Sequence, residues 1–375
     1  MKTYRGNLEI SADDRRDFSD LAEVTGDLIL YEGASLTAPV LAEVTGYLWL
    51  SQGAILTAPV LAKTGYLWLY EGASLTAPLL AEVTGDLWLS QGASLTAPVL
   101  AKTGDLRLDQ GASLTAPLLA EVTGDLRLYE GAVLTAPVLA KTGDLWLYQG
   151  ASLTAPVLAE VTGDLGLYEG ASLTAPVLAK TGDLRLSQGA VLTAPVLAKT
   201  GYLILYEGAS LTAPVLAKTR YLILCEGASL TAPVLAEVTE HLRLDQGASL
   251  TAPLLAKTGD LILYEGASLT APNLIFLPGG VELTVWKKCW DGVIVKLRIP
   301  PEAKRIGRVG YKCRAEFAEV IEIEGAEIAT GTYDPTFVYR VGSVVRAKDF
   351  DETVTTCAPG IHFFLTRDEA KGYIL

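Results

Sequence analysis

The tetrapeptide Leu-Thr-Ala-Pro recurs thirteen times in this chain, and this repeat limits the possible folds more than any other feature. Its prolines are 19 or 20 residues apart, at Pro39, Pro59, Pro78, Pro98, Pro117, Pro137, Pro156, Pro176, Pro195, Pro214, Pro233, Pro253 and Pro272. A repeat this short cannot bury its own apolar side chains, so it must stack on its neighbours. The spacing therefore predicts a solenoid.

Within one coil, Leu145-Trp146-Leu147 predicts a short strand whose leucines face the core and whose tryptophan faces outward. Thr142-Gly143-Asp144 before it and Gly150 after it are typical of turns. The repeated proline lacks an amide hydrogen, so we expect that side of the coil to be extended without a full hydrogen-bonded ladder. Coils with Glu-Val-Thr are one residue longer than coils with Lys-Thr, which indicates a one-residue insertion at a turn.

The pattern Leu-x-Leu-x-x-Gly followed by leucine resembles the leucine-rich repeat, with glycine where that family usually has asparagine. It also resembles the single-stranded β-helix repeats of receptor-L type. The resemblance covers about residues 21–277 and implies a stacked β-solenoid in either form. We therefore expect a mainly β chain, with an N-terminal cap at 1–20, a β-solenoid at 21–280 and a small α+β domain at 281–375.

The net charge of -13 is confined to the repeats. From Val281 onward there are 14 basic and 14 acidic residues, and the other 16 basic and 29 acidic residues precede Val281. This acidity disfavours nucleic acid or an anionic membrane as a partner of the solenoid. No apolar run approaches the roughly 18 residues of a membrane span, and Met1–Gly6 lacks an apolar signal segment. We expect a soluble, cytoplasmic protein and leave association with a virion open.

The outward position between the two strand leucines holds tryptophan or arginine in many coils and Gly166 in one. The candidate residues are Trp49, Trp68, Trp88, Arg107, Arg127, Trp146 and Arg185, with Tyr70, Tyr129 and Tyr148 two positions further along their strands. These residue types are enriched in interface hot spots, so this column is the candidate surface for a protein partner. The alternative is that the aromatic rings only stabilise one another along the stack.

An acidic column lies at the turn before the strand, at Asp86, Asp105, Asp125, Asp144, Asp164 and Asp183. Like charges at this spacing cost stability, so we expect each aspartate to cap its own turn. Two alternatives are that the column binds a cation or imitates the DNA backbone.

A second charged column reads Glu23, Glu43, Lys63, Glu82, Lys102, Glu121, Lys141, Glu160, Lys180 and Lys199, and continues to Lys257. Its middle part alternates in sign. This alternation predicts ion pairs between neighbouring coils.

The composition changes near Val281, where strand-like runs at Val293–Leu297 and Glu319–Ile323 begin to alternate with charged turns. A helix is predicted at Thr366–Ala370, with Thr366 as its cap. The segments Lys312–Glu316 and Cys357–Phe364 resemble a domain of unknown function found at the end of phage and bacterial repeat proteins. This resemblance covers about residues 291–373 and implies a phage or prophage setting.

Cys357, Gly360 and His362 form the candidate motif of this domain, because a cysteine and a histidine can make a nucleophile. The sequence offers no third member, and a histidine beside two phenylalanines is more often a packed core residue. Tyr339-Arg340 and Gly360–Phe363 distantly resemble ADP-ribosyltransferase strands, but no catalytic glutamate can be assigned.

Cys289, Cys313, Cys357 and His362 lack the close Cys-x-x-Cys pair of a typical zinc site. We therefore expect no metal, no cofactor and no enzymatic activity. The leading hypothesis is a non-enzymatic scaffold for a protein partner. The alternatives are a DNA mimic that inhibits a DNA-binding protein and an ADP-ribosyltransferase-like activity in the C-terminal domain.

Overall fold

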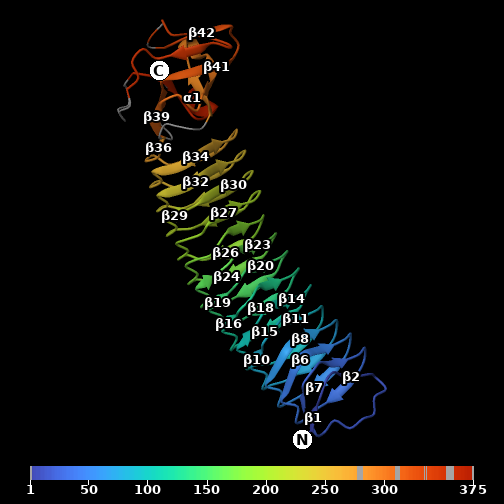
Figure 1. Ribbon diagram of the computed structural model, residues 1–375. Coiled ribbons are helices and arrows are strands. Elements are labelled where there is room, and N and C mark those ends of the chain that lie inside the picture. The colour runs from blue at the N-terminus through green and yellow to red at the C-terminus, as the bar shows by residue number, and fades with distance from the viewer. Residues whose placement is uncertain are drawn as a thin grey trace. The chain divides into compact units, whose positions relative to one another are not determined.

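The computed structural model describes residues 2–276, 282–308, 313–332, 334, 336–351 and 359–373. The chain is mostly β, with a solenoid of about 14 coils and a sheet-rich C-terminal region (Figure 1). This confirms the predicted fold class. The chain divides into two compact units, Met1–Gly201 and Tyr202–Leu375, and the boundary between them lies inside the repeats.

Each coil contributes strands to a wide parallel sheet, and each coil after the first also contributes one three-residue strand to a narrow sheet. In Met1–Gly201 the wide sheet contains β1 (Lys2–Tyr4), β2 (Leu8–Ile10), β3 (Leu21–Val24), β4 (Leu28–Leu30), β6 (Glu43–Leu50), β8 (Lys63–Leu69), β10 (Glu82–Val83), β11 (Leu87–Leu89), β13 (Lys102–Thr103), β14 (Leu106–Leu108), β16 (Glu121–Val122), β17 (Leu126–Leu128), β19 (Lys141–Thr142), β20 (Leu145–Leu147), β22 (Glu160–Val161), β23 (Leu165–Leu167) and β25 (Leu184–Leu186). The narrow sheets contain β5 (Ser35–Thr37), β7 (Ile55–Thr57), β9 (Ser74–Thr76) and β12 (Ser94–Thr96), then β15 (Ser113–Thr115), β18 (Val133–Thr135), β21 (Ser152–Thr154), β24 (Ser172–Thr174) and β26 (Val191–Thr193).

The core lies between the two sheets and is filled by the repeated leucines and alanines. In one coil Leu134, Ala136, Leu139, Leu145 and Leu147 are all fully buried. Neighbouring coils pair in register, so each leucine lies against the leucine of the next coil. One coil therefore supplies only one layer of this core, and stacking buries it.

The proline side of the coil differs from the expectation. The residues before each proline do form a hydrogen-bonded ladder, for example β18 with β21, where Leu134 pairs with Leu153. The proline instead opens a tight turn, in which the Leu139 amide donates to the Ala136 carbonyl at 3.1 Å. Proline suits the second position of such a turn, because its missing N–H is not needed there. The narrow sheet therefore ends before Pro137.

The N-terminal segment expected to act as a cap contributes a coil of its own. Its strands β1 and β2 pair in parallel with β3 and β4, and Leu8 and Ile10 are buried in register with Leu28 and Leu30.

In Tyr202–Leu375 the coils continue with β27 (Tyr202–Leu205), β29 (Lys218–Thr219), β30 (Tyr221–Leu224), β32 (Glu237–Leu244) and β34 (Lys257–Leu263), and with the narrow strands β28 (Ser210–Thr212), β31 (Ser229–Thr231), β33 (Ser249–Thr251) and β35 (Ser268–Thr270). After the coils the strands become antiparallel. One sheet contains β36 (Ile275–Phe276), β39 (Arg305–Arg308), β40 (Cys313–Ala315) and β45 (Ile361–Phe363). A second contains β37 (Leu283–Lys288), β38 (Ile294–Ile299), β41 (Phe317–Ile323) and β44 (Val344–Arg346), and a hairpin contains β42 (Ile328–Thr330) and β43 (Val338–Arg340).

The two strands and the helix predicted in this region are present as β38, β41 and α1 (Arg367–Gly372). The Thr366 hydroxyl accepts a hydrogen bond from the Glu369 amide at 3.2 Å, and the Glu369 carboxylate accepts one from the Thr366 amide at 3.0 Å. This reciprocal capping box confirms the predicted cap. A single-turn 3₁₀ helix, η1, spans Trp290–Gly292.

Candidate interaction surfaces

The outward residues of the strand face form a file of aromatic rings and arginine guanidinium groups in Met1–Gly201. Trp49, Trp68 and Trp88 occupy equivalent positions on neighbouring strands. Their ring centroids are 5.6 Å and 5.7 Å apart along the file. The Tyr70 ring stacks on Trp49 at 5.1 Å and lies 5.4 Å from Trp88. Four rings from three coils therefore form one cluster.

Arg107 extends this cluster into the following coils. Its guanidinium lies 4.6 Å from the Trp88 ring and 4.5 Å from the Tyr129 ring, so it sits between two aromatic faces. Asp109 holds it there by accepting from Arg107 Nε at 2.6 Å, and also accepts from Trp88 Nε1 at 2.7 Å. The Tyr129 ring then stacks on Tyr148 at 4.7 Å.

Gly166 breaks the column of large outward residues, and the structure gives the reason. A Cβ atom at Gly166 would lie 2.3 Å from the ring of Trp146 in the preceding coil, so this ring covers the glycine. Arg185 of the following coil lies 6.0 Å from the same ring, and Tyr168 lies 6.4 Å from it. The Trp146 ring thus occupies the space that a side chain at position 166 of the next coil would need.

The predicted strand-face residues therefore share one face, and each is partly exposed. They also contact one another, so mutual stabilisation and an exposed surface coexist here. Arg127 differs in its contacts, because its guanidinium binds the carboxylate of Asp125 and lies 3.6 Å from that of Asp105.

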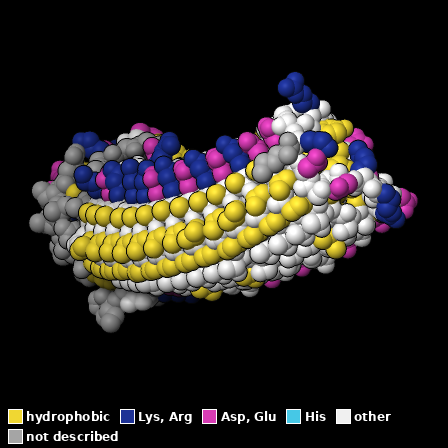
Figure 2. All heavy atoms as spheres, turned by 90° about the horizontal axis from the view of Figure 1, so that it is seen from below, with side chains coloured by type: hydrophobic (Ala, Val, Ile, Leu, Met, Phe, Trp, Pro, Cys, Tyr) yellow, Lys and Arg dark blue, Asp and Glu magenta, His cyan; other side chains and the backbone are white. Residues whose placement is uncertain are grey.

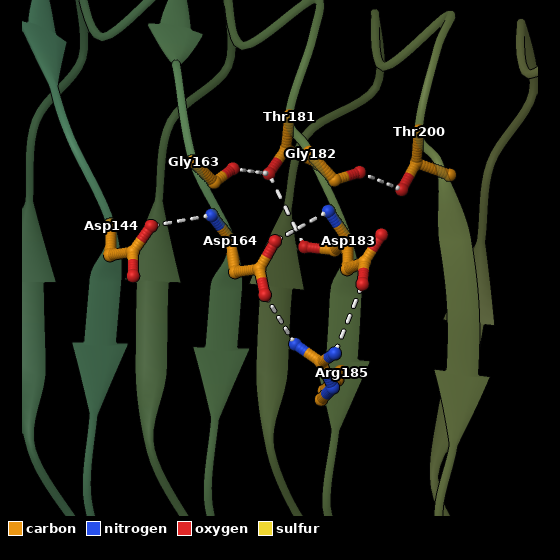
Figure 3. A network of polar contacts seen from close by, with 8 residues as sticks. All are labelled: Asp144, Gly163, Asp164, Thr181, Gly182, Asp183, Arg185 and Thr200. Carbon is orange, nitrogen blue, oxygen red and sulfur yellow. Dashed lines mark hydrogen bonds and ion pairs between the residues drawn. The ribbon is translucent and has the colours of Figure 1, made fainter.

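The acidic column forms a ladder between coils (Figure 3). Asp144 Oδ1 accepts from the Asp164 amide at 2.9 Å, and Asp164 Oδ1 accepts from the Asp183 amide at 3.1 Å. Asp86, Asp105 and Asp125 each accept from the next coil in the same way. The expected local turn caps are thus replaced by caps on the following coil.

Neighbouring glycines and threonines complete this ladder. A Cβ atom at Gly163 would lie 1.8 Å from Asp144 Oδ1, so only glycine lets the carboxylate come this close. The Thr181 hydroxyl donates to the Gly163 carbonyl at 3.4 Å, and the Thr200 hydroxyl donates to the Gly182 carbonyl at 2.9 Å (Figure 3). The triplet Thr-Gly-Asp is therefore one hydrogen-bonding unit repeated from coil to coil.

Arginine side chains form ion pairs with carboxylates of the acidic column and partly neutralise its negative charge. Arg185 bridges Asp164 at 2.8 Å and Asp183 at 3.0 Å. At the N-terminal end of the column, burial and the neighbouring Asp105 raise the pKa of Asp86 above its ordinary value. Among the described residues, no cluster of three or more His, Cys, Asp or Glu side chains could hold a metal ion.

Tyrosine replaces aspartate at this position in some coils. Tyr47 and Tyr66 are two such residues in neighbouring strands, β6 and β8. The two tyrosine rings stack at 4.5 Å. Tyr47 and Tyr66 thus share an aromatic stack where Asp144 and Asp164 share a carboxylate ladder.

An apolar surface that we did not predict from the sequence lies at the turn that follows the narrow sheet. Exposed side chains occupy the position after the proline, for example Leu79 (52%), Leu118 (50%), Val157 (44%) and Val177 (44%). The alanine two residues further on, such as Ala120, is also exposed. The signal was the repeated Pro-Val/Leu-Leu-Ala, whose first Val or Leu the turn directs outward. We call the proline, Val/Leu and exposed alanine positions of Met1–Gly201 the apolar strip.

The charged column, the glutamates and lysines from Glu23 to Lys199, borders this strip. Figure 2 shows rows of hydrophobic side chains beside alternating basic and acidic ones. The predicted ion pairs between coils are present. Their N–O distances are 3.1 Å for Lys63–Glu82, 3.2 Å for Lys102–Glu121 and 2.9 Å for Lys180–Glu160.

The candidate motif of the C-terminal domain is described only in part, because Cys357 lies outside the described residues. His362 lies in β45, paired with Arg314 of β40, and its carbonyl accepts from Lys287 Nζ at 3.1 Å. Gly360 has φ of 152°, and a Cβ atom there would lie 3.0 Å from Arg314. The glycine thus permits close packing beside His362.

Two arginines of this domain are almost fully buried, Arg305 at 4% and Arg314 at 3% exposure. Burial lowers the pKa of Arg305 from its ordinary value. Their burial could not be predicted, because in the sequence they are two basic residues among fourteen from Val281 onward.

Comparison with known proteins gives similarity to uncharacterised relatives. Residues 273–370 match the model of a family of unknown function, DUF5758. A segment of 52 residues is 38% identical to the uncharacterized protein L223 of Acanthamoeba polyphaga mimivirus, and the match covers 14% of this chain and 33% of that protein. The chain thus spans about a third of the length of this relative. No solved structure matches the chain significantly.

No helix in the described parts of the chain is long and apolar enough to cross a membrane.

Proposed function

We propose that this chain is a non-enzymatic repeat scaffold that binds a protein partner through the strand face of Met1–Gly201. The observation that carries the proposal is the file of partly exposed tryptophan, tyrosine and arginine side chains from Trp49 to Arg185. These are the residue types that most often dominate binding energy at protein interfaces.

The contacts within the file favour binding, because they fix the side chains before a partner arrives. The Trp88 indole donates to Asp109, and Arg107 lies between two rings. An ordered side chain loses less conformational freedom on association, and this freedom otherwise costs about 0.5–1.5 kcal/mol for each side chain immobilised. The surface is thus preorganised.

The acidic column supports a structural role more than DNA mimicry. One oxygen of each carboxylate from Asp86 to Asp164 accepts a backbone N–H of the next coil. Arg127 and Arg185 also pair with the column.

We extend the proposal to a leucine-rich-repeat-like coil, a cytoplasmic location and a viral setting. The viral setting is supported by the short match to a mimivirus protein.

The test is affinity capture with the full chain as bait, comparing wild type with the double variant Trp68→Ala/Trp88→Ala. Val191→Ala is the matched control, since this side chain is 56% exposed on a narrow-sheet strand. A partner retained by wild type and control but lost by the double variant supports the proposal. Equal retention by all three refutes it for this face. Thermal unfolding of each bait shows whether the coils remain folded.

A further inference from the structure

The charged column of Met1–Gly201 has two places where like charges lie side by side. Glu23 pairs in register with Glu43 near one end, and Lys180 pairs with Lys199 near the other. Between them the signs alternate. Like charges directly opposite each other on neighbouring strands are destabilising. Lys180 also pairs with Glu160 on its other side, but a further opposite charge from outside the column would stabilise both of its ends.

The order of signs shows where that charge can come from. Read in reverse, the ten residues from Glu23 to Lys199 give the opposite sign at every position. Two such columns laid antiparallel therefore match at all ten positions, through the five pairs Glu23–Lys199, Glu43–Lys180, Lys63–Glu160, Glu82–Lys141 and Lys102–Glu121. The two-fold axis would pass between Lys102 and Glu121. The paired glutamates at one end meet the paired lysines at the other.

The apolar strip beside the column fits the same arrangement. A two-fold axis perpendicular to the solenoid axis and lying in the contact plane brings strip against strip and column against column. In this register the larger Leu79 and Leu118 lie opposite the smaller Val138 and Val99. A surface that meets itself through one two-fold axis is the usual geometry of a homodimer. An exposed apolar strip bordered by charge is typical of an interaction surface.

The size of the strip is consistent with a reversible dimer. Nine coils at about 4.8 Å each span about 40 Å. The turn that begins the strip spans less than about 7 Å, and two extended residues at about 3.3 Å each bring the width, up to the charged column, to about 13 Å. Each copy would then contribute about 500 Å², below the roughly 800 Å² per partner of a standard interface.

From these observations, we infer that the apolar strip and charged column of Met1–Gly201 bind a second copy of this chain in antiparallel orientation. This surface is distinct from the strand face proposed for a protein partner. The dimer would leave the strand face of both copies available and present it twice, which raises the avidity for a partner with repeated sites.

The test is sedimentation equilibrium of the full chain over a range of concentrations. Wild type is expected to form a concentration-dependent dimer. The variants Glu23→Lys/Glu43→Lys and Lys180→Glu/Lys199→Glu are each expected to weaken self-association at least about tenfold, since each replaces four opposite-charge contacts by like-charge contacts. An equimolar mixture of the two variants is expected to recover wild-type affinity, because opposite charges face each other again in the heterodimer. A monomeric wild type, or a mixture no tighter than its components, overturns the inference.

A matched pair of substitutions tests the apolar strip. Leu118→Asp, near the two-fold axis, is expected to abolish the dimer. Leu254→Asp lies in Tyr202–Leu375, outside the ten paired positions, and is expected to leave the dimer intact. The two leucines have nearly equal exposure, 50% and 51%, so both variants should fold alike. Equal effects of the two variants contradict the proposed register. The variant Trp68→Ala/Trp88→Ala is expected to dimerise normally, which keeps this test separate from that of partner binding.

Discussion

The hydrogen bond from the Asp164 amide to Asp144 Oδ1 gives a quantitative test of the ladder between coils. Asp144→Ala leaves this partly buried amide without its acceptor. A hydrogen bond to a charged group contributes about 1.5–3 kcal/mol, and partial exposure to water reduces this to about 1–2 kcal/mol. Asp144→Asn retains an acceptor oxygen but loses its charge, so it should lower the free energy of unfolding by less than Asp144→Ala does, by about 0.5–1 kcal/mol. The first coil already uses this substitution, because Asn7 Oδ1 accepts from the Asp27 amide at 3.0 Å.

Gly163 provides the second arm of a double-mutant cycle. In wild type, Gly163→Ala would place its Cβ atom 1.8 Å from Asp144 Oδ1. Such overpacking costs about 1–3 kcal/mol. Asp144→Ala removes the carboxylate with which this Cβ atom collides. The backbone nitrogen of residue 144, 3.3 Å from the Cβ atom, remains as a near neighbour. The double variant should therefore be destabilised by less than the sum of the single variants, by at least about 1 kcal/mol.

The assay is urea unfolding followed by circular dichroism, with hydrogen exchange of the Asp164 amide as a local readout. The local readout is needed because long repeat arrays do not always unfold in two states. Gln149→Ala, at an exposed side chain, is the control and should change stability by less than about 0.5 kcal/mol. Two results would refute the reasoning: equal losses for Asp144→Ala and Asp144→Asn, or single-variant effects that add within about 0.3 kcal/mol.

Three further predictions concern single groups. The pKa of Asp86 is raised in the folded protein, so ionisation of its carboxyl group favours unfolding. The protonated carboxyl therefore contributes to the free energy of unfolding. This contribution is fully present below pH 3.8 and is lost as the pH rises through the folded-state pKa. Asp86→Asn should therefore gain stability relative to wild type between pH 3 and pH 7, and a gain independent of pH in urea unfolding would contradict this. Burial raises the pKa of the Cys289 thiol to about 11, so mass spectrometry should find it unmodified by iodoacetamide at pH 8 in the native protein and modified after unfolding. Thr366→Ala removes the side-chain half of the capping box and should cost about 1 kcal/mol of local stability, visible as faster exchange of the Glu369 amide.

The features that repeat within one coil could be predicted from the amino-acid sequence. The period of the prolines, the alternation around Trp146 and the turn at Gly150 all depend on neighbouring residues, so the solenoid and its buried leucines follow from them. The ion pairs of the charged column were also predictable, because in-register stacking places equivalent residues side by side. The helix beginning at Arg367 followed from its own cap.

Which atoms of successive coils meet could not be predicted from the sequence, because this depends on how the coils stack. The Asp144 carboxylate caps the amide of Asp164, about one coil away, because the glycine between them lets the two backbones approach. The turn at each proline, in turn, directs residues such as Leu118 to the surface although Leu119 beside it is buried. The residue types in one coil do not specify which way a side chain points or which neighbour it contacts. Both depend on the path of the backbone around the turn and on the stagger between coils. The apolar strip and its place beside the charged column therefore became visible only in the folded stack.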